Sequence, residues 1–258
     1  LPAREVLPKL KTAANKALEL DDSLAEAHTS LAWAKFHDWD WAGAEKEFQR
    51  AIALNSNYTT AHSWYGEYLM VLGRSSDALA EFNRAYELNP LSTTTNLALG
   101  YRLYYARQYE PAIGQIQKTL AMDSTFVPAH DYLGRAYEQN GMTAQSLAEF
   151  HKALDLSEGD TNELAALGQA YAVSHQPAEA RKILDQLKDR SQQTYVQPAS
   201  LAVIYMALGD KDQAFDWLQK AYDDRSGWLL YLKVDPWADS VRNDARFTDL
   251  VRRVFPPN

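Results

Sequence analysis

Six histidines are the residues of this sequence best suited to metal binding. Three of them, His28, His62 and His130, are separated by multiples of 34 residues. Equivalent places in a repeating structure lie too far apart to share one ion, so we interpret these three as packing residues. The others lack a second ligand three or four residues away that would complete a tetrahedral set; they are His37, His151 and His175.

Carboxylate pairs and nucleophiles also give little support for catalysis. Asp21–Asp22 and Asp223–Asp224 fall at expected helix ends, where solvated charges are common. The sequence has no G-x-S-x-G, H-E-x-x-H, P-loop or dinucleotide-binding glycine pattern. It contains no cysteine for thiol chemistry, disulfides or thiolate metal sites. We therefore predict that the protein is not an enzyme and uses neither a cofactor nor a metal ion.

Small residues recur every 34 positions along the chain. This spacing is the period of an array of helix-turn-helix repeats. From its length alone, a chain of 258 residues would be expected to form one or two domains. The repeat period replaces that expectation, because a solenoid grows by stacking repeats. One series is Ala44, Ala78, Ala112, Ser146, Ala180 and Ala214, and a second is Gly66, Gly100, Gly134 and Gly168.

Each repeat is expected to contain two antiparallel helices, helix A and helix B. Places are counted from the start of each repeat. A small residue at the eighth place, in helix A, and a bulky residue at the twenty-fourth place, in helix B, would let the two backbones pack closely. Gly73, Gly141 and Gly209 fall in the turns between the helices, where a residue with positive φ ends helix A. The predicted organisation is a partial repeat (1–24), six repeats (25–58, 59–92, 93–126, 127–160, 161–194 and 195–228) and a C-terminal cap (229–258).

This pattern resembles the tetratricopeptide repeat. The resemblance covers nearly the whole chain and implies an all-α superhelical solenoid of antiparallel helix pairs with a C-terminal helical cap. Segments 31–55 and 224–254 are similar to the C-terminal repeat regions of large bacterial signalling proteins, which carry winged-helix DNA-binding or serine/threonine kinase domains. The start of the sequence within a repeat predicts a fragment of such a protein.

In this family the partner binds in a concave groove lined by one face of the A helices. The resemblance therefore implies a protein or peptide partner, with Trp33, Tyr101, Tyr105 and Arg135 carrying the binding. The predicted groove residues are Trp33, Phe36, His37, Glu67, Tyr101, Tyr104, Tyr105, Arg135, Glu138 and Gln139.

The residues that line the far end of this groove are small and apolar. Helix A of the sixth repeat, PASLAVIYMALG, is apolar on every side, and such a helix is normally buried all round. Either the groove holds a peptide along its length, or the C-terminal segment covers its far end. We predict that this segment packs on the last repeats as short helices near 236–241 and 244–254.

Two tryptophans, Trp39 and Trp41, occupy the turn of the first full repeat in the segment HDWDWAG. Tryptophan is enriched at binding hot spots, but filling the gap beside the neighbouring turn is the favoured interpretation.

Charge and hydropathy limit the other partners. The net charge of −8 and the pI of about 5.3 argue against direct binding of nucleic acid, which needs clustered lysine and arginine. No apolar run is long enough for a membrane span. The compartment is not determined by the sequence, with cytoplasm slightly preferred over periplasm.

The function predicted from the sequence is non-enzymatic protein or peptide binding, as the sensing or docking arm of a bacterial signalling or transcription-regulating protein. One alternative is self-assembly into a homodimer through the exposed edge of residues 1–24. Another is a sensor of small apolar ligands, because ligand pockets are usually apolar with few polar groups.

Overall fold

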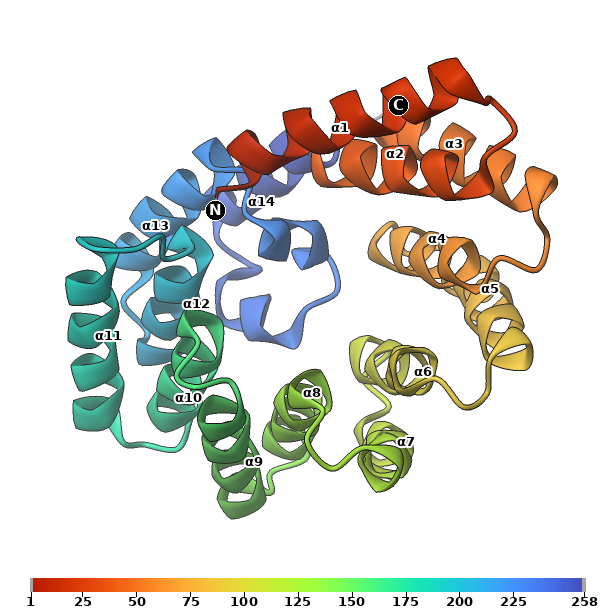
Figure 1. Cartoon of the computed structure of the whole chain (residues 1–258). Helices are drawn as coiled ribbons and strands as arrows, with labels where there is room; N and C mark the ends of the chain where they lie inside the picture. Colours follow the sequence, from red (N-terminus) through yellow and green to blue (C-terminus); the bar gives the residue numbers. More distant parts are fainter. Residues whose placement is uncertain (1, 257–258) are drawn as a thin grey trace. The chain divides into compact units, whose positions relative to one another are not determined.

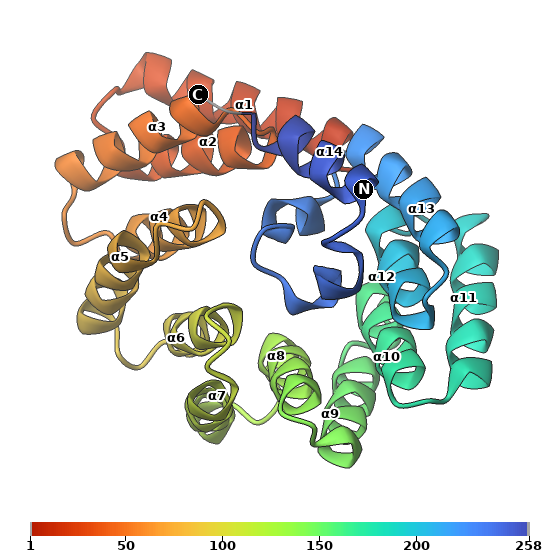
Figure 2. The same ribbon diagram turned by 180° about the vertical axis from the view of Figure 1, so that it is seen from behind.

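The computed structural model describes residues 2–256 and consists of helices joined by short turns, with no strand in that range (Figures 1 and 2). Leu1, Pro257 and Asn258, which belong to the predicted segments 1–24 and 229–258, lie outside the described residues. The chain divides into two units, Leu1–Ala98 and Leu99–Asn258, which we describe separately. None of the described helices is long and apolar enough to cross a membrane.

The first unit begins with a single helix that precedes the helix pairs. In α1, Pro8 lies inside the helix. The following helices alternate as helix A and helix B, and α6 continues into the second unit. The elements are α1 (Ala3–Leu20), α2 (Ala25–His37), α3 (Trp41–Leu54), α4 (Thr59–Val71), α5 (Ser75–Leu88) and α6 (Thr93–Tyr105).

The second unit contains the remaining helix pairs and the C-terminal segment, which we define as residues 227–256. The part of this segment that carries η2 packs beside α12 (Figures 1 and 2). Its elements are α7 (Tyr109–Met122), α8 (Val127–Gln139), α9 (Thr143–Leu156), α10 (Thr161–Val173), α11 (Pro177–Ser191), α12 (Pro198–Leu208), α13 (Lys211–Asp223), η1 (Gly227–Tyr231), η2 (Pro236–Val241) and α14 (Ala245–Val254).

Close contact between helix A and helix B depends on glycine. A Cβ atom added at Gly100 would lie 2.5 Å from Ile116, and one added at Gly134 would lie 3.0 Å from Phe150. Both partners are the predicted bulky residues at the twenty-fourth place. The fifth repeat differs, because a Cβ at Gly168 would meet Ile183 at 2.8 Å instead of the predicted Leu184. Ile204 of α12 lies equally close, so the bulky side chains there come from the adjacent position on α11 and from the next helix A.

The turn between helix A and helix B has a left-handed residue at the same place in every full repeat. Glycine occupies this place in three repeats, as predicted, with φ between 77° and 79°. The other three repeats have a side chain there, at φ between 60° and 64°, which is uncommon for a residue other than glycine. The six residues are Trp39, Gly73, Arg107, Gly141, His175 and Gly209.

The three periodic histidines join the two helices of a repeat to the preceding loop. In His62, Nδ1 lies 2.6 Å from Glu81 Oε2 and Nε2 lies 3.0 Å from the Ser56 carbonyl oxygen. Both neighbours are acceptors, so the ring satisfies them only as a doubly protonated imidazolium. His28 with Glu47 and Asp22, and His130 with Glu149 and Ser124, have the same arrangement, which agrees with a structural role for these residues.

Helix α12 is buried almost completely, from Ala199 to Met206. The C-terminal segment contributes Leu229, Leu230 and Leu232, which are fully buried. Its short helices η2 and α14 lie at the ranges that the sequence predicts, with η2 as a 3-10 helix. The segment therefore gives the apolar end of the second unit a packed surface.

Candidate docking face

The predicted groove residues are distributed over both units. Those in the first unit lie on α2 and α4, and those in the second lie on α6 and α8. The first set is Trp33, Phe36, His37 and Glu67, and the second is Tyr101, Tyr104, Tyr105, Arg135, Glu138 and Gln139.

In the first unit, Trp33 is the centre of an aromatic cluster. Its ring lies 4.4 Å from that of His37 and 4.5 Å from that of Trp64. Burial lowers the pKa of His37 to about 4, so this ring is neutral at pH 7. Phe36 is fully buried and Glu67 is also buried, so Trp33 and His37 form the accessible part of this predicted set.

The turn tryptophans also belong to the packing of the first unit. Trp39 is buried, and Trp41 contacts the rings of Phe36 and Tyr68. This agrees with the interpretation that they fill space beside the turn.

In the second unit, the tyrosines of α6 pack inward and against the C-terminal segment. Tyr104 is fully buried, and the ring of Tyr105 stacks on that of Tyr231 at 5.2 Å. Tyr101 lies 5.3 Å from the Tyr132 ring. The contact with Tyr231 shows that Tyr105 already has a partner within the chain.

Arg135 of α8 is the centre of a charged cluster. It donates a hydrogen bond to Asp131 at 2.8 Å, and its Nη1 lies 3.7 Å from Asp235 of the C-terminal segment. Its guanidinium lies 3.7 Å from the centre of the Trp237 ring, which is a cation–π contact. Asp235 is fully buried and also accepts a hydrogen bond from Trp228 at 2.8 Å.

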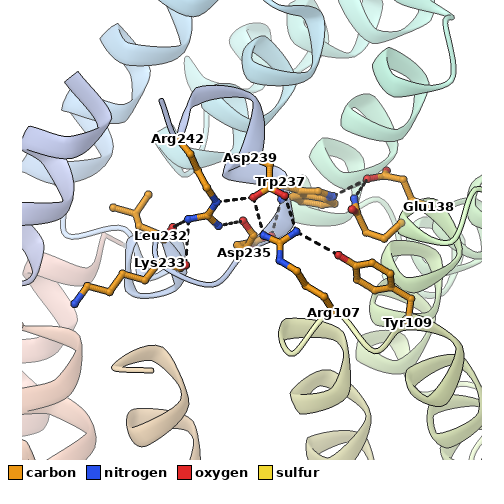
Figure 3. Close-up of polar contacts among 10 residues, drawn as sticks. Arg107, Tyr109, Glu138, Leu232, Lys233, Asp235, Trp237, Asp239 and Arg242 are labelled. Atoms are coloured by element: carbon orange, nitrogen blue, oxygen red, sulfur yellow. Dashed lines mark hydrogen bonds and ion pairs between the residues drawn. The ribbon is translucent and has the colours of Figure 1, made fainter. Parts of the chain in front are cut away.

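Glu138 lies one turn further along α8 and accepts hydrogen bonds from three side chains. Trp237 Nε1 donates to its Oε1 at 3.0 Å (Figure 3). Gln139 Nε2 and Gln169 Nε2 donate to the same oxygen at 3.1 and 3.2 Å. Burial nevertheless raises the pKa of Glu138 to about 7, because these bonds and the charge of Arg135 only partly offset desolvation.

A further carboxylate, that of Glu163 on α10, adds to the acidity of this region. Its pKa is raised by burial and then by the negative charge of Asp131. With Asp131, Glu138 and Asp235, four carboxylates therefore surround one arginine. Burial raises the pKa of three of them, Glu138, Glu163 and Asp235.

Arg107, at the turn between α6 and α7, binds the far side of η2. Its two terminal nitrogens donate to the two oxygens of Asp239 at 2.6 and 2.8 Å (Figure 3). Arg242 donates to the same carboxylate and to the carbonyl oxygens of Leu232, Lys233 and Asp235. Burial opposes the ionisation of Asp239, but the two arginines outweigh it and lower its pKa.

We call Tyr105, Arg107, Arg135 and Glu138 the docking face. Beside it lies a pocket of about 170 Å³. It is bordered by Arg135, Asn162, Ser200 and Val203 on the helices and by Trp228 and Trp237 on the C-terminal segment. Among residues 2–256, no group of three His, Asp or Glu side chains is placed to hold a metal ion.

Sequence reasoning did not identify Arg107, Asp235, Trp237 or Asp239 as parts of this face. A signal for Arg107 exists in the 34-residue pattern: it occupies the place where Gly73, Gly141 and Gly209 stand. Trp39 and His175 hold the same left-handed place, so this signal marks three candidate positions, of which Arg107 is one.

Comparisons with known proteins agree with the fold. The sequence model of the tetratricopeptide repeat family matches residues 29–93, and a second model of this repeat matches residues 199–223. The chain contains tetratricopeptide repeats. The predicted all-α solenoid is confirmed by these matches and by the structural neighbours.

The solved structures that resemble this chain differ in biological setting. The APC/C heterotetramer Cut9–Hcn1 matches with a TM-score of 0.67 and 16% identity, covering 96% of this chain and 46% of that one. PilW, a type IV pilus biogenesis factor, matches with a TM-score of 0.62 and 19% identity, covering 77% and 90%. At these identities the likeness establishes the tetratricopeptide repeat fold alone.

A curated relative is anaphase-promoting complex subunit 3 of Schizosaccharomyces pombe. It is 25% identical over 111 residues, which are 42% of this chain and 16% of the relative. The chain thus matches only about a sixth of that protein. Proteins built from this repeat are typically scaffolds for interactions between proteins, and this chain has the same scaffold.

Proposed function

We propose that this chain is a non-enzymatic scaffold that binds a protein or peptide. The observation that carries the proposal is the docking face, which holds a segment of polypeptide by side-chain contacts. Trp237, Asp235 and Asp239 are bound there by arginine and glutamate side chains. A face that binds one short segment in this way has the chemistry needed to bind another.

The finer role that we propose is the docking arm of a bacterial signalling or transcription-regulating protein. It is supported by the resemblance of segments 31–55 and 224–254 to the repeat regions of such proteins. We also propose that the chain does not itself bind nucleic acid, because its net charge is −8.

The test is a pull-down from bacterial lysate with the full chain and two variants, Arg107→Ala in the docking face and Trp33→Ala/Tyr101→Ala among the other predicted groove residues. We expect a protein to be retained by the wild type and lost by at least one of these two variants. Tyr86→Ala is the matched control, because Tyr86 is an exposed aromatic residue on α5 outside the predicted groove. Circular dichroism must show that all three variants are folded. Equal retention by all four chains would contradict a binding role for these residues.

Self-assembly is a second candidate, favoured by the surface of α1. Leu20 at the end of this helix is 79% exposed and Val6 is 40% exposed. A homodimer that buries these side chains should dissociate in the variant Leu20→Glu/Val6→Glu. Sedimentation velocity of the wild type and this variant tests the candidate, and a monomeric wild type at high concentration would reject it.

A further inference from the structure

We propose that the docking face is a receptor for peptides of the pattern acidic–x–Trp–x–acidic, and that residues Asp235–Asp239 are its resident occupant. A partner carrying this pattern would displace the resident segment. The inference rests on the proposed function and deepens it, because it names the chemistry of the partner and the contact that regulates its access.

The central tryptophan provides the anchor. Trp237 is only 7% exposed, its indole N–H donates to Glu138 at 3.0 Å, and its ring receives the guanidinium of Arg135 at 3.7 Å. A buried aromatic side chain with both a polar and a cationic partner is typical of a residue that dominates an interface. The face therefore selects tryptophan over aromatic residues that lack an N–H donor.

The two acidic residues lie on either side of this anchor and meet different arginines. Asp235 faces Arg135, with its carboxylate 3.7 Å from Nη1, and Asp239 forms the bidentate pair with Arg107. Bidentate arginine–carboxylate pairs add geometric specificity to charge attraction. Two separate arginines thus recognise acidic residues that lie two positions before and two positions after Trp237.

The backbone of Arg107 supports a binding role for this residue. It has φ of 61° at the turn where three other repeats have glycine. A residue other than glycine is strained in this conformation. The arginine side chain offsets that cost by its contact with Asp239, which a glycine could not make.

The occupant is a short turn. Asp235 caps η2 by accepting from the backbone N–H of Trp237 at 3.0 Å. Outside these five residues, Trp228 donates to the Asp235 carboxylate, and Arg242 donates to Asp239 and to the Asp235 carbonyl oxygen. A peptide that extends to Arg242 therefore keeps the cap and the Arg242 contacts, while Trp228 remains in the chain.

Exchange of this turn need not unfold the rest of the C-terminal segment. Leu229, Leu230 and Leu232 are fully buried and anchor the chain before it. After it, α14 is held to α13 by hydrogen bonds of 2.9 Å from Arg246 to Asp212 and from Arg253 to Gln219. By contrast, the Arg107–Asp239 pair lies at an exposed rim, with side chains 46% and 41% exposed. The rim contact is where displacement would begin.

The experiment uses a fluorescent peptide with the sequence of residues 233–242, KVDPWADSVR, and the full chain in a fluorescence anisotropy titration. The wild type should bind it weakly, because the resident segment competes. The variant Trp237→Ala has lost the resident anchor and should bind the same peptide at least tenfold more tightly. A peptide in which this tryptophan is alanine should not bind either chain.

A charge exchange tests the predicted register. In the Trp237→Ala background, Arg107→Asp should weaken binding at least tenfold, and a peptide with Asp239→Arg should restore it. Aspartate tolerates the left-handed conformation better than most residues, so this substitution should not disturb the turn. Restoration by the exchanged peptide would assign the contact to this pair.

Trp237→Ala can also lower the stability of the second unit, so Asp239→Arg provides a second opened chain with an exposed substitution. Failure of both folded variants to bind the peptide would overturn the proposal. Dimerisation of the wild type by exchange of this segment between copies, without peptide binding, would also overturn it. If neither folded variant binds the peptide, but a lysate protein is retained by the wild type and lost in Trp33→Ala, the scaffold function stands and only the receptor role of the docking face is rejected.

Discussion

Arg107 binds both carboxylate oxygens of Asp239 from a backbone conformation that favours glycine. The two residues are 132 positions apart in the sequence and join the turn after α6 to η2. Arg107 thus combines the conformational cost of a left-handed backbone with a long-range contact.

Replacing Arg107 separates these two effects. Arg107→Gly relieves about 1 kcal/mol of left-handed strain and removes an exposed ion pair worth up to about 1 kcal/mol. We expect little change in global stability, but faster hydrogen exchange in Pro236–Val241. His175→Gly is the control, because it relieves the same strain at an exposed turn without removing this pair, and it should raise the melting temperature. Unchanged exchange in Arg107→Gly would mean that the pair does not hold η2.

The raised pKa of Glu138 predicts a fall in stability with rising pH. Burial raises this pKa to about 7 in the folded protein, above the usual value of 4.5. The folded state therefore binds the proton more tightly, and the stabilisation present below pH 4.5 is lost as the pH rises to 7. Urea unfolding should be measured at pH 5 and at pH 8. The free energy of unfolding should differ less between these two pH values in Glu138→Gln than in the wild type. Equal differences would show that Glu138 does not carry this linkage.

His62 should be cationic in the folded protein. Burial opposes its protonation, but the hydrogen bonds to Glu81 and to the Ser56 carbonyl and the charge of Glu81 raise its pKa overall. The contacts of the His62 ring therefore stabilise the fold below pH 6.5, and this contribution is lost as the pH rises through the raised pKa. NMR titration of the ring protons should show a lower pKa in Glu81→Gln. An unchanged value would contradict the assigned cause.

Close packing at Gly100 gives a prediction with an internal control. Gly100→Ala places a Cβ 2.5 Å from Ile116, and overpacking of this kind costs about 1–3 kcal/mol. Gly114→Ala, on α7, meets nothing within 4 Å and should stabilise the helix by about 1 kcal/mol. The melting temperature should therefore fall in Gly100→Ala and rise in Gly114→Ala. A stabilised Gly100→Ala would show that Ile116 moves away without cost.

The repeated elements were predictable because their signals are local and periodic. The glycine and bulky places predicted the contacts of Gly100 with Ile116 and of Gly134 with Phe150. At Gly168 the same pattern predicted a contact with Leu184, but the residue of α11 in contact is Ile183. A shift of one position on a helix rotates the contacting side chain by about 100°, and periodicity alone cannot detect it.

The docking face was only partly predictable. Arg135 and Glu138 could be chosen from their places in a repeat, and a covering role for the C-terminal segment followed from the apolar α12. The contact of Trp237 with both residues could not, because it joins positions 99 residues apart in the case of Glu138 and follows no repeat. Contacts of that kind depend on how the last turn folds back, which single-sequence patterns do not encode.

The contacts of His62 have a mechanical consequence. Its ring joins the loop that carries Ser56 to both helices of its repeat, α4 and α5. A neutral imidazole has one N–H, so loss of a proton removes one of the two hydrogen bonds and frees either the loop or Glu81. The stiffness of this joint is thereby coupled to proton concentration. Bending of the polypeptide at this loop should require less force in alkaline solution.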